Sequence, residues 1–193
     1  MASNTSGGET DKRTVDGDLV RRARDGDHDA FGVIVETYRD RLFGLAVGIL
    51  RNRSAAEDVV QEAFIKAYKN LKGFRGDSSI YTWLYRIAVN TAHNHLRRAS
   101  RRTEVDFEDV APIIETRGQN PAESTANAEL GTAIDGAIQD LPPRQREVFM
   151  LHYFERMTHR EIAEVLGVTE GAIKANFFHA VQKLKGALKP YVT

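Results

Sequence analysis

The chain has 193 residues, and its 27 basic residues are balanced by 27 acidic residues. This length predicts one or two domains, and the 28% of charged residues is typical of a globular protein. The sequence contains no cysteine, which excludes disulfides, thiol catalysis and thiolate metal sites. Zero net charge argues against a free-standing protein that binds nucleic acids without specificity.

The N-terminal segment, residues 1–15, is polar and rich in Gly, Ser and Thr. It lacks the apolar stretch of a signal peptide, and no later stretch approaches the ~20 apolar residues that span a bilayer. The sequence therefore predicts a disordered N-terminal tail on a cytoplasmic protein that does not insert into a membrane.

Apolar residues at helical spacing predict three helices in the first part of the chain. A short helix over about 16–25 is followed by a long helix over about 28–50, with Asp27 as the N-cap of the long helix. The Ser-Ala-Ala-Glu sequence at 54–57 has the form of a capping box, so the third helix is predicted over about 55–71.

The outer side of this third helix is acidic but has an isoleucine at its centre. The residues on that side are Asp58, Gln61, Glu62 and Ile65. Such an isoleucine is either an isolated exposed side chain, which protein surfaces tolerate, or the anchor of a contact with another protein. The pattern alone leaves both interpretations open.

The next segment, 74–102, is strongly basic, with six arginines and one aspartate. A helix is predicted from about residue 79, with Asp77 or Ser78 as its N-cap. Its apolar face is predicted to be buried, and its opposite face carries Trp83, Arg86, Asn90, Asn94 and Arg97. An aromatic ring, amides and guanidiniums together suit a nucleic acid with exposed bases. The alternative is a core tryptophan beside solvated arginines.

The stretch 101–126 has no helical periodicity and contains two prolines. It is acidic, since the segment 103–130 has seven acidic residues against one arginine. It is predicted to be a flexible linker. Its ~26 residues could extend to roughly 85 Å, which would tether two DNA-reading units more than two DNA turns apart.

A second helical unit is predicted over 127–190. A Pro-Pro pair at 142–143 starts one of its helices, and the Thr-His-Arg-Glu sequence at 158–161 has the form of a capping box. A short helix ending at Gly167 and a longer helix capped by Thr169 follow. This order predicts a helix-turn-helix. The chain is thus predicted to be all-α, with two small helical domains joined by a flexible acidic linker.

The last helix turns Lys174, Ala175, Phe178 and His179 away from its apolar stripe. The early outward residues of a recognition helix reach base edges in the major groove, and an outward phenylalanine can contact a thymine methyl. Alternatively, Phe178 packs on another helix of the unit. Asn176 lies obliquely on the helical wheel.

The sequence predicts neither an enzymatic site nor a metal or cofactor site. No glycine-rich phosphate loop, nucleophile elbow or HExxH motif is present. His93 and His95 lie about 200° apart on their helix and cannot hold one metal together. Asp58 and Glu62 have the spacing of paired carboxylates, but they are predicted on a solvent face without further ligands.

Four stretches resemble the extracytoplasmic-function (ECF) group of bacterial sigma factors, and they occur in that family's order. They are AEDVVQEAFIKAY at 56–68, FRGDSSIYTWLYRIAVNTAHNHL at 74–96, LPPRQREVFMLHYFE at 141–155 and HREIAEVLGVTEGAIKANFF at 159–178. The resemblance covers about 18–190. It implies sigma region 2 over 16–100 and sigma region 4 over 127–190. It further implies a non-enzymatic subunit that binds core RNA polymerase, recognises −35 and −10 promoter elements and promotes promoter opening.

The resemblance also implies partners and site residues. The face of Asp58, Gln61, Glu62 and Ile65 would dock on the clamp coiled coil of the largest polymerase subunit, and region 4 on the flap of the second-largest subunit. An anti-sigma factor is a further implied partner. The −10 element would be read by Phe74, Arg75, Asp77, Ser78, Ser79, Trp83 and Asn90, with Arg86 and Arg97 on phosphates.

The −35 element would be read by Lys174, Ala175, Asn176, Phe178 and His179. This helix has fewer arginines than its counterpart in some relatives, so the −35 sequence is expected to differ. Two alternatives are a helix-turn-helix regulator that acts without polymerase and a module that binds only proteins. The first alternative predicts tight, salt-sensitive duplex binding by the isolated chain.

Overall fold

The computed structural model describes residues 17–101 and 125–191, and the regular structure of these residues is helical throughout. The predicted tail and almost all of the predicted linker lie outside the described residues. Within those residues, no helix combines the length and apolar character needed to cross a membrane. The predicted all-α class is confirmed.

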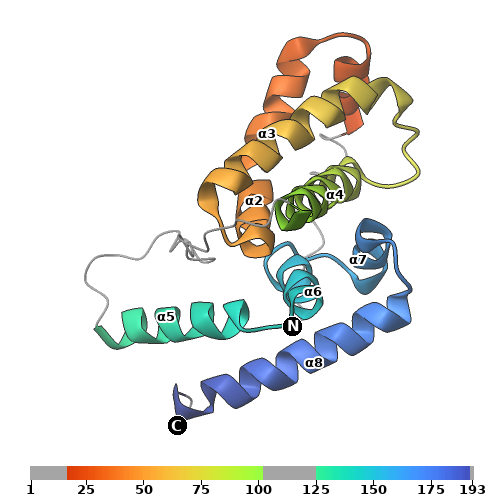
Figure 1. Ribbon diagram of the computed structural model, residues 1–193. Helices are drawn as coiled ribbons and strands as arrows, with labels where there is room; N and C mark the ends of the chain where they lie inside the picture. Colours follow the sequence, from red (N-terminus) through yellow and green to blue (C-terminus); the bar gives the residue numbers. More distant parts are fainter. Residues whose placement is uncertain (1–16, 102–124, 192–193) are drawn as a thin grey trace, which may run out of the picture.

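The first part of the chain forms a small helical bundle (Figure 1). A short helix over 17–24 precedes three long helices. The long helices are α2 (His28–Leu50), α3 (Arg53–Asn70) and α4 (Ile80–Arg101), with the 3-10 turn η1 (Leu71–Gly73) after α3. The three long helices pack against one another in pairs. Their buried stripes follow the predicted helical periodicity.

Two N-caps in this bundle lie where a short polar side chain meets the first free amides. Asp27 accepts a hydrogen bond from the Ala30 amide at 3.0 Å, as predicted for α2. The cap of α3 is Asn52, which accepts from the Ala55 amide at 2.8 Å. The predicted capping box at 54–57 is therefore wrong, because the asparagine stands earlier in the chain and satisfies the amides first.

The prediction for the start of α4 is wrong by one or two residues. The side-chain oxygen of Ser79 accepts from the Thr82 amide at 3.1 Å, so Ser79 takes the place predicted for Asp77 or Ser78. Gly76, with φ of 79°, adopts the left-handed conformation and turns the loop ahead of this cap. The helix can begin only after that turn is complete.

The second part of the chain contains the predicted helix-turn-helix. Its helices are α5 (Thr125–Gln139), α6 (Pro143–Tyr153), α7 (His159–Leu166) and α8 (Glu170–Leu188), followed by the 3-10 turn η2 (Lys189–Tyr191). Thr158 and Glu161 form the predicted capping box of α7. Gly167, with φ of 65°, ends α7, and Thr169 caps α8. This confirms the turn between α7 and α8.

One large cluster of buried side chains includes residues from both parts of the chain. Apolar side chains of α2, α3 and α4 form one cluster with Val148, Met150, Leu151 and Ile162 from the second part. A smaller cluster, which includes Ile138, holds α5 against α8. Figure 1 shows α6 between α2 and α8, and α7 beside α4. The sequence predicted two helical domains but not this shared core.

Tyr68 and Leu96 lie on the apolar faces of α3 and α4, yet both are exposed. Tyr68 lies near the end of α3, where its ring packs edge-on against Phe31 and its hydroxyl bonds His28 Nδ1 at 2.9 Å. Leu96 lies beyond Ala92, the last buried residue of α4. Periodicity assigns a residue to a face of a helix, but burial also requires a neighbouring helix over that turn.

Candidate polymerase and DNA interfaces

The acidic side of α3 is largely open to solvent. Asp58, Gln61 and Ile65 are exposed, and Ile65 keeps 48% of its surface. Glu62 is half-buried, and its carboxylate contacts Lys66 Nζ at 2.7 Å. The hydrogen bond from Lys66 holds the pKa of Glu62 below its ordinary value. Three of the four predicted polymerase contacts thus share an open surface, and the fourth is engaged within α3.

A groove of about 1320 Å³ runs beside this face, between α2 and α3 and as far as the end of α6. Its lining is mixed, with apolar side chains such as Phe43 and Phe64 next to charged ones such as Arg39. Asp58, Gln61 and Ile65 also line the groove. A single exposed isoleucine would be unremarkable. An isoleucine at the edge of a large groove with apolar walls is placed to anchor a protein contact.

The loop before α4 brings together two aromatic rings that the sequence placed apart. Phe74 and Trp83 lie with ring centroids 5.1 Å apart, and both are half-buried against the core. Trp83 is therefore neither a fully exposed stacking platform nor a fully buried core residue. In the same loop Arg75 and Asp77 are exposed, while Ser78 is half-buried. Ser79, being the N-cap of α4, has a structural role.

A second, smaller hollow of about 290 Å³ adjoins this aromatic pair. The short helix over 17–24 supplies one wall, with Arg21 and Arg24, and the loop supplies the other, with Phe74, Arg75 and Ser78. Sequence reasoning missed the two arginines of the short helix. The available signal was their position three residues apart on a helix whose buried residues, Leu19, Val20 and Ala23, take the other side.

The polar face of α4 is divided between solvent and the second part of the chain. Asn90 and Arg97 are exposed, and Arg97 bonds the side chain of Asn94. Arg86 is half-buried, and its Nε donates to the main-chain oxygen of Glu164 in α7 at 3.1 Å. One predicted phosphate contact is thus already engaged within the protein.

The predicted recognition surface of α8 is open. Lys174, Ala175, Phe178 and His179 are exposed, and Phe178 keeps 58% of its surface. Phe178 therefore does not pack into the core of its own unit. Lys174 pairs with Glu170 one turn earlier, at 2.8 Å.

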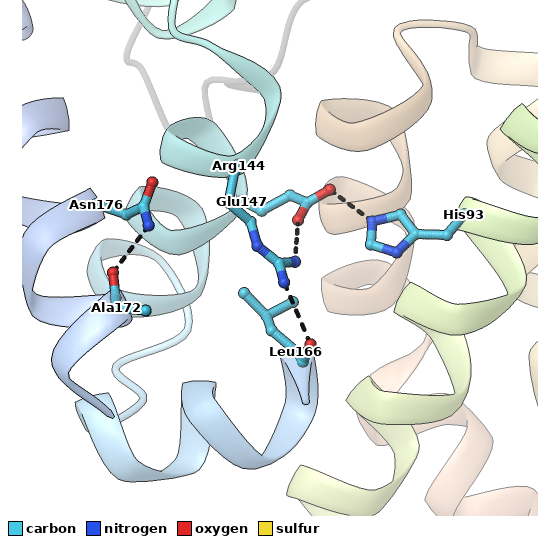
Figure 2. A network of polar contacts seen from close by, with 6 residues as sticks. All are labelled: His93, Arg144, Glu147, Leu166, Ala172 and Asn176. Carbon is cyan, nitrogen blue, oxygen red and sulfur yellow. Dashed lines mark hydrogen bonds and ion pairs between the residues drawn. The ribbon is translucent and has the colours of Figure 1, made fainter. Parts of the chain in front are cut away.

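Asn176, also predicted at this surface, is only half-exposed. Its Nδ2 donates to the main-chain oxygen of Ala172 at 2.8 Å, as Figure 2 shows. The amide therefore bonds the backbone of its own helix, as its oblique position suggested.

Comparisons with known proteins agree with this arrangement. Residues 34–102 match the family described as Sigma-70 region 2, and residues 132–184 match Sigma-70, region 4. The chain is 38% identical to the RNA polymerase sigma-H factor of Pseudomonas aeruginosa, over 91% of this chain and 94% of that protein. It is 35% identical to the ECF RNA polymerase sigma-E factor of Escherichia coli, over 90% and 94%.

Two solved structures share the fold. CnrH, in complex with the cytosolic domain of CnrY, matches with a TM-score of 0.67 at 24% identity, over 91% of this chain and 98% of that one. The sigma factor RpoE of Bartonella quintana, in complex with the anti-sigma factor NepR, matches with a TM-score of 0.67 at 21% identity, over 82% and 96%.

Two helical units, one with an open helix-turn-helix and one with an aromatic and basic helix, define a sigma-type initiation subunit. The chain belongs to the ECF group of the sigma-70 family. It directs RNA polymerase to promoters for transcription initiation, and it is a non-enzymatic polymerase subunit. This membership replaces the alternative of a regulator that acts without polymerase. The parts of the chain up to Arg101 and from Thr125 are called region 2 and region 4 below.

Proposed function

We propose that this sigma factor docks on core polymerase through α3, reads the −10 element with the loop before α4 and α4 itself, and reads the −35 element with α8. The observation that carries the docking step is the exposed Ile65 at the edge of the groove. Asp58 and Gln61 beside it supply a polar rim around an apolar anchor, which is the usual arrangement of a binding hot spot. The partner of this face is the clamp coiled coil of the largest subunit. Region 4 pairs with the flap of the second-largest subunit, and the protein acts in the cytoplasm with its polymerase.

The −10 element is read as a melted strand. Extruding a base costs a few kcal/mol, and stacking on an aromatic side chain returns ~1–3 kcal/mol per base. The hollow beside Phe74 lies at the small end of ligand pockets, which suits one nucleobase. Arg21, Arg24 and Arg75 around it supply positive charge for the neighbouring phosphates. Asn90, exposed on α4, offers an amide to a base edge.

The −35 element is read as a duplex by the exposed face of α8. Phe178 supplies apolar contact for a thymine methyl, and Lys174 and His179 supply donors beside it. Asn176 is the weakest member of this set, because its Nδ2 already bonds its own helix. The set contains no arginine, so Lys174 is its one side chain of the kind that most commonly reads guanine in the major groove.

Run-off transcription from a library of randomised promoters tests the proposal. Bacterial core polymerase is assayed with and without the protein, and transcripts that depend on the protein are sequenced. We expect their templates to share two spaced upstream elements. If the protein binds core but selects templates that share only one element, the assignment of two DNA-reading surfaces is wrong.

We further propose that an anti-sigma factor restrains this protein by covering the groove between α2 and α3. CnrH and the Bartonella RpoE were each solved with a protein partner. The groove here has a volume of about 1320 Å³, and Ile65 on its edge would be contested by the partner and by polymerase. A purified candidate partner should compete with core polymerase for the protein. A partner that binds alongside core would contradict the shared groove.

A further inference from the structure

A row of exposed side chains runs along α8, the helix proposed to read the −35 element. Glu170, Lys174 and Phe178 follow one another at intervals of four residues, so they are neighbours on the helix surface. The side chains of Glu170 and Lys174 keep 47% and 61% of their surface, and Phe178 keeps 58%. The buried residues of the helix, among them Ile173, point into the core instead. The residues predicted to read the −35 element begin at Lys174, so this surface starts one turn earlier than the sequence indicated.

Glu170 lies at the N-terminal end of the recognition helix. It is the first residue of α8, and the N-cap before it is Thr169, whose side-chain oxygen accepts from the Ala172 amide at 3.3 Å. Gly167, with φ of 65°, turns the chain between α7 and α8. In a helix-turn-helix, the N-terminal residues of the second helix contact base edges. The cap and the turn therefore fix the direction of the helix end that carries Glu170.

The charge of Glu170 is balanced within α8. Its Oε1 lies 2.8 Å from Lys174 Nζ. The hydrogen bond from Lys174, and then the charge of Lys174, lower the pKa of Glu170, so its carboxylate is ionised at neutral pH and acts only as an acceptor. A lone carboxylate at a DNA surface would be repelled by the phosphates. The pair carries no net charge, so it can place an acceptor beside DNA with much less of that repulsion.

A paired carboxylate and ammonium match the major-groove edge of a G·C base pair. Cytosine presents a donor there, its N4 amino group, and guanine presents the acceptors N7 and O6. Glutamate accepts from cytosine N4, and lysine donates to guanine. Glu170 and Lys174 offer the acceptor and the donors side by side. None of the residues already proposed for the −35 contact is acidic. Glu170 therefore supplies a kind of base contact that this set lacks.

An acid at this position can also have a purely structural role. Negative side chains in the first turn of a helix stabilise it through the helix dipole, and Glu170 lies in the first turn of α8. Loss of that role would weaken the helix as a whole and would affect every −35 sequence alike. Loss of a base contact would change the preference at one base pair. The two roles therefore differ in what a selection experiment measures.

We propose that Glu170 is a specificity-determining residue: its carboxylate accepts a hydrogen bond from N4 of a cytosine in the −35 element, while Lys174 neutralises the carboxylate and donates to the guanine of the same or the next base pair. The proposal rests on the −35 surface proposed above and narrows what that surface reads. The −35 element of this protein therefore contains a G·C pair whose cytosine faces the first turn of α8. Phe178 faces a different base pair, because about 12 Å of helix separates it from Glu170 and base pairs stack at about 3.4 Å.

Run-off transcription by holoenzyme, reconstituted from core polymerase and the full chain, tests the proposal. The templates derive from a promoter selected by the wild-type protein, with only the −35 element randomised again, so that the −10 contacts stay constant. Glu170→Gln replaces the carboxylate by an amide, and glutamine pairs with adenine rather than with cytosine. We expect the preference for cytosine at one position to fall at least roughly fivefold, with a gain of adenine there and no change elsewhere.

Two further variants serve as controls. Glu170→Ala offers neither an acceptor nor a donor, so the same position should lose its preference without gaining a new one. Glu164→Gln makes the matched chemical change in α7, where the carboxylate of Glu164 contacts Arg160 at 3.6 Å and is not part of the row on α8. It should leave the −35 preference as it is in the wild type. An equal loss at every position in both Glu170 variants would reveal the structural role alone and overturn the base contact.

The salt dependence of promoter binding by the same holoenzymes tests the pairing with Lys174. Glu170→Gln leaves the ammonium of Lys174 unbalanced at the DNA surface. The slope of log K against log salt should therefore become steeper, by up to ~0.9 for one additional positive charge. An unchanged slope would contradict the neutralising role of the pair.

The selection also separates this proposal from the one on which it rests. If the wild-type holoenzyme shows no −35 preference at all, the −35 surface on α8 is refuted, and the role of Glu170 with it. If the wild type selects a −35 element and both Glu170 variants keep the same preference at every position, Glu170 reads no base, while the −35 surface stands. A selected element that consists only of A·T pairs would also overturn the proposal, because it offers no cytosine.

Discussion

Replacing Ile65 by glutamate places a charge at the centre of the proposed polymerase contact. Full burial of an isoleucine is worth ~1.5–3 kcal/mol, and Ile65 still exposes 48% of its surface, so roughly 1 kcal/mol of burial remains for a partner to gain. The new carboxylate would also lose hydration in the contact and stand near Asp58, which adds at least ~1 kcal/mol. We expect a loss of ~2 kcal/mol, or roughly 30-fold in Kd. Competition with a labelled wild-type protein for core polymerase measures it.

Val33→Glu is the matched control for this measurement. Val33 is a branched apolar residue on α2 with 44% of its surface exposed, and it is not part of the groove lining. Because both positions are exposed, neither change should alter thermal stability appreciably. Equal competition by Ile65→Glu and the wild type would refute the docking assignment. If both variants lose the same affinity for core polymerase, the added charge on region 2 weakens binding and the position of Ile65 has no special role.

Four further changes test the DNA surfaces and region 4. Asn90→Ala should impair promoter opening in a permanganate assay while core binding stays near normal. His179→Ala should change the −35 preference by roughly 1–3 kcal/mol at a contacted base in a selection experiment. Thr158→Ala should destabilise region 4 by ~1 kcal/mol in thermal unfolding, because it removes the cap of α7. Burial, with the charges of His152 and Lys174, lowers the pKa of His159, so region 4 should lose stability as pH falls through the ordinary histidine range.

The direction of the pH effect follows from which state binds the proton. A lowered pKa means that the unfolded chain takes up the proton first, so the stabilisation is present above the ordinary pKa of histidine and is lost below it. His159→Phe should remove this part of the pH dependence, and an unchanged slope in that variant would contradict the assignment. The prediction for Asn90 is refuted if Asn90→Ala weakens binding to core polymerase. The prediction for His179 is refuted if His179→Ala leaves the −35 preference unaltered. The prediction for Thr158 is refuted if Thr158→Ala unfolds at the same temperature as the wild type.

Helix boundaries followed from the sequence wherever one side chain could cap. Asp27, Thr158 and Thr169 were each the only short polar residue at the right place. The prediction failed where candidates competed. The N-cap of α3 is Asn52, which precedes the predicted capping box at 54–57. The N-cap of α4 is Ser79, which follows the turn at Gly76. The local sequence indicates which residues could be the N-cap, but the conformation of the preceding turn decides which of them is.

The exposed sides of α3 and α8 were predictable because they depend on periodicity within one helix, whereas Arg86 on the predicted exposed face of α4 is half-buried and bonds Glu164 of α7. Ile65 and Phe178 are open as predicted. Contacts between segments were not predictable in the same way. The pairing of Phe74 with Trp83 and the position of Arg21 beside the loop depend on how the helices pack, so the basic hollow was missed.

The packing of α6 against region 2 left one trace in the sequence. The stretch 148–151 of α6, Val-Phe-Met-Leu, is apolar at four successive positions, and these residues are all buried together with Arg146 and Glu147. A helix that is apolar over consecutive positions is covered on more than one side. α5 and α8 account for one side, and region 2 accounts for the other. Glu155, by contrast, has no distinguishing sequence pattern, although Arg41 of α2 contacts its carboxylate at 2.8 Å.

Because α4 and α6 belong to one chain, the junction between the regions is a unimolecular contact. A tether of this length gives the regions an effective concentration of the order of millimolar, so a contact worth only ~4 kcal/mol between separate molecules is enough to keep them together. Its strength does not depend on how much protein the cell makes. On a promoter, if the two proposed DNA-reading surfaces each bind their element, binding of one surface raises the local concentration of the other surface near its own element. The covalent link would therefore strengthen the contact between the regions in one state and the binding of the second element in the other.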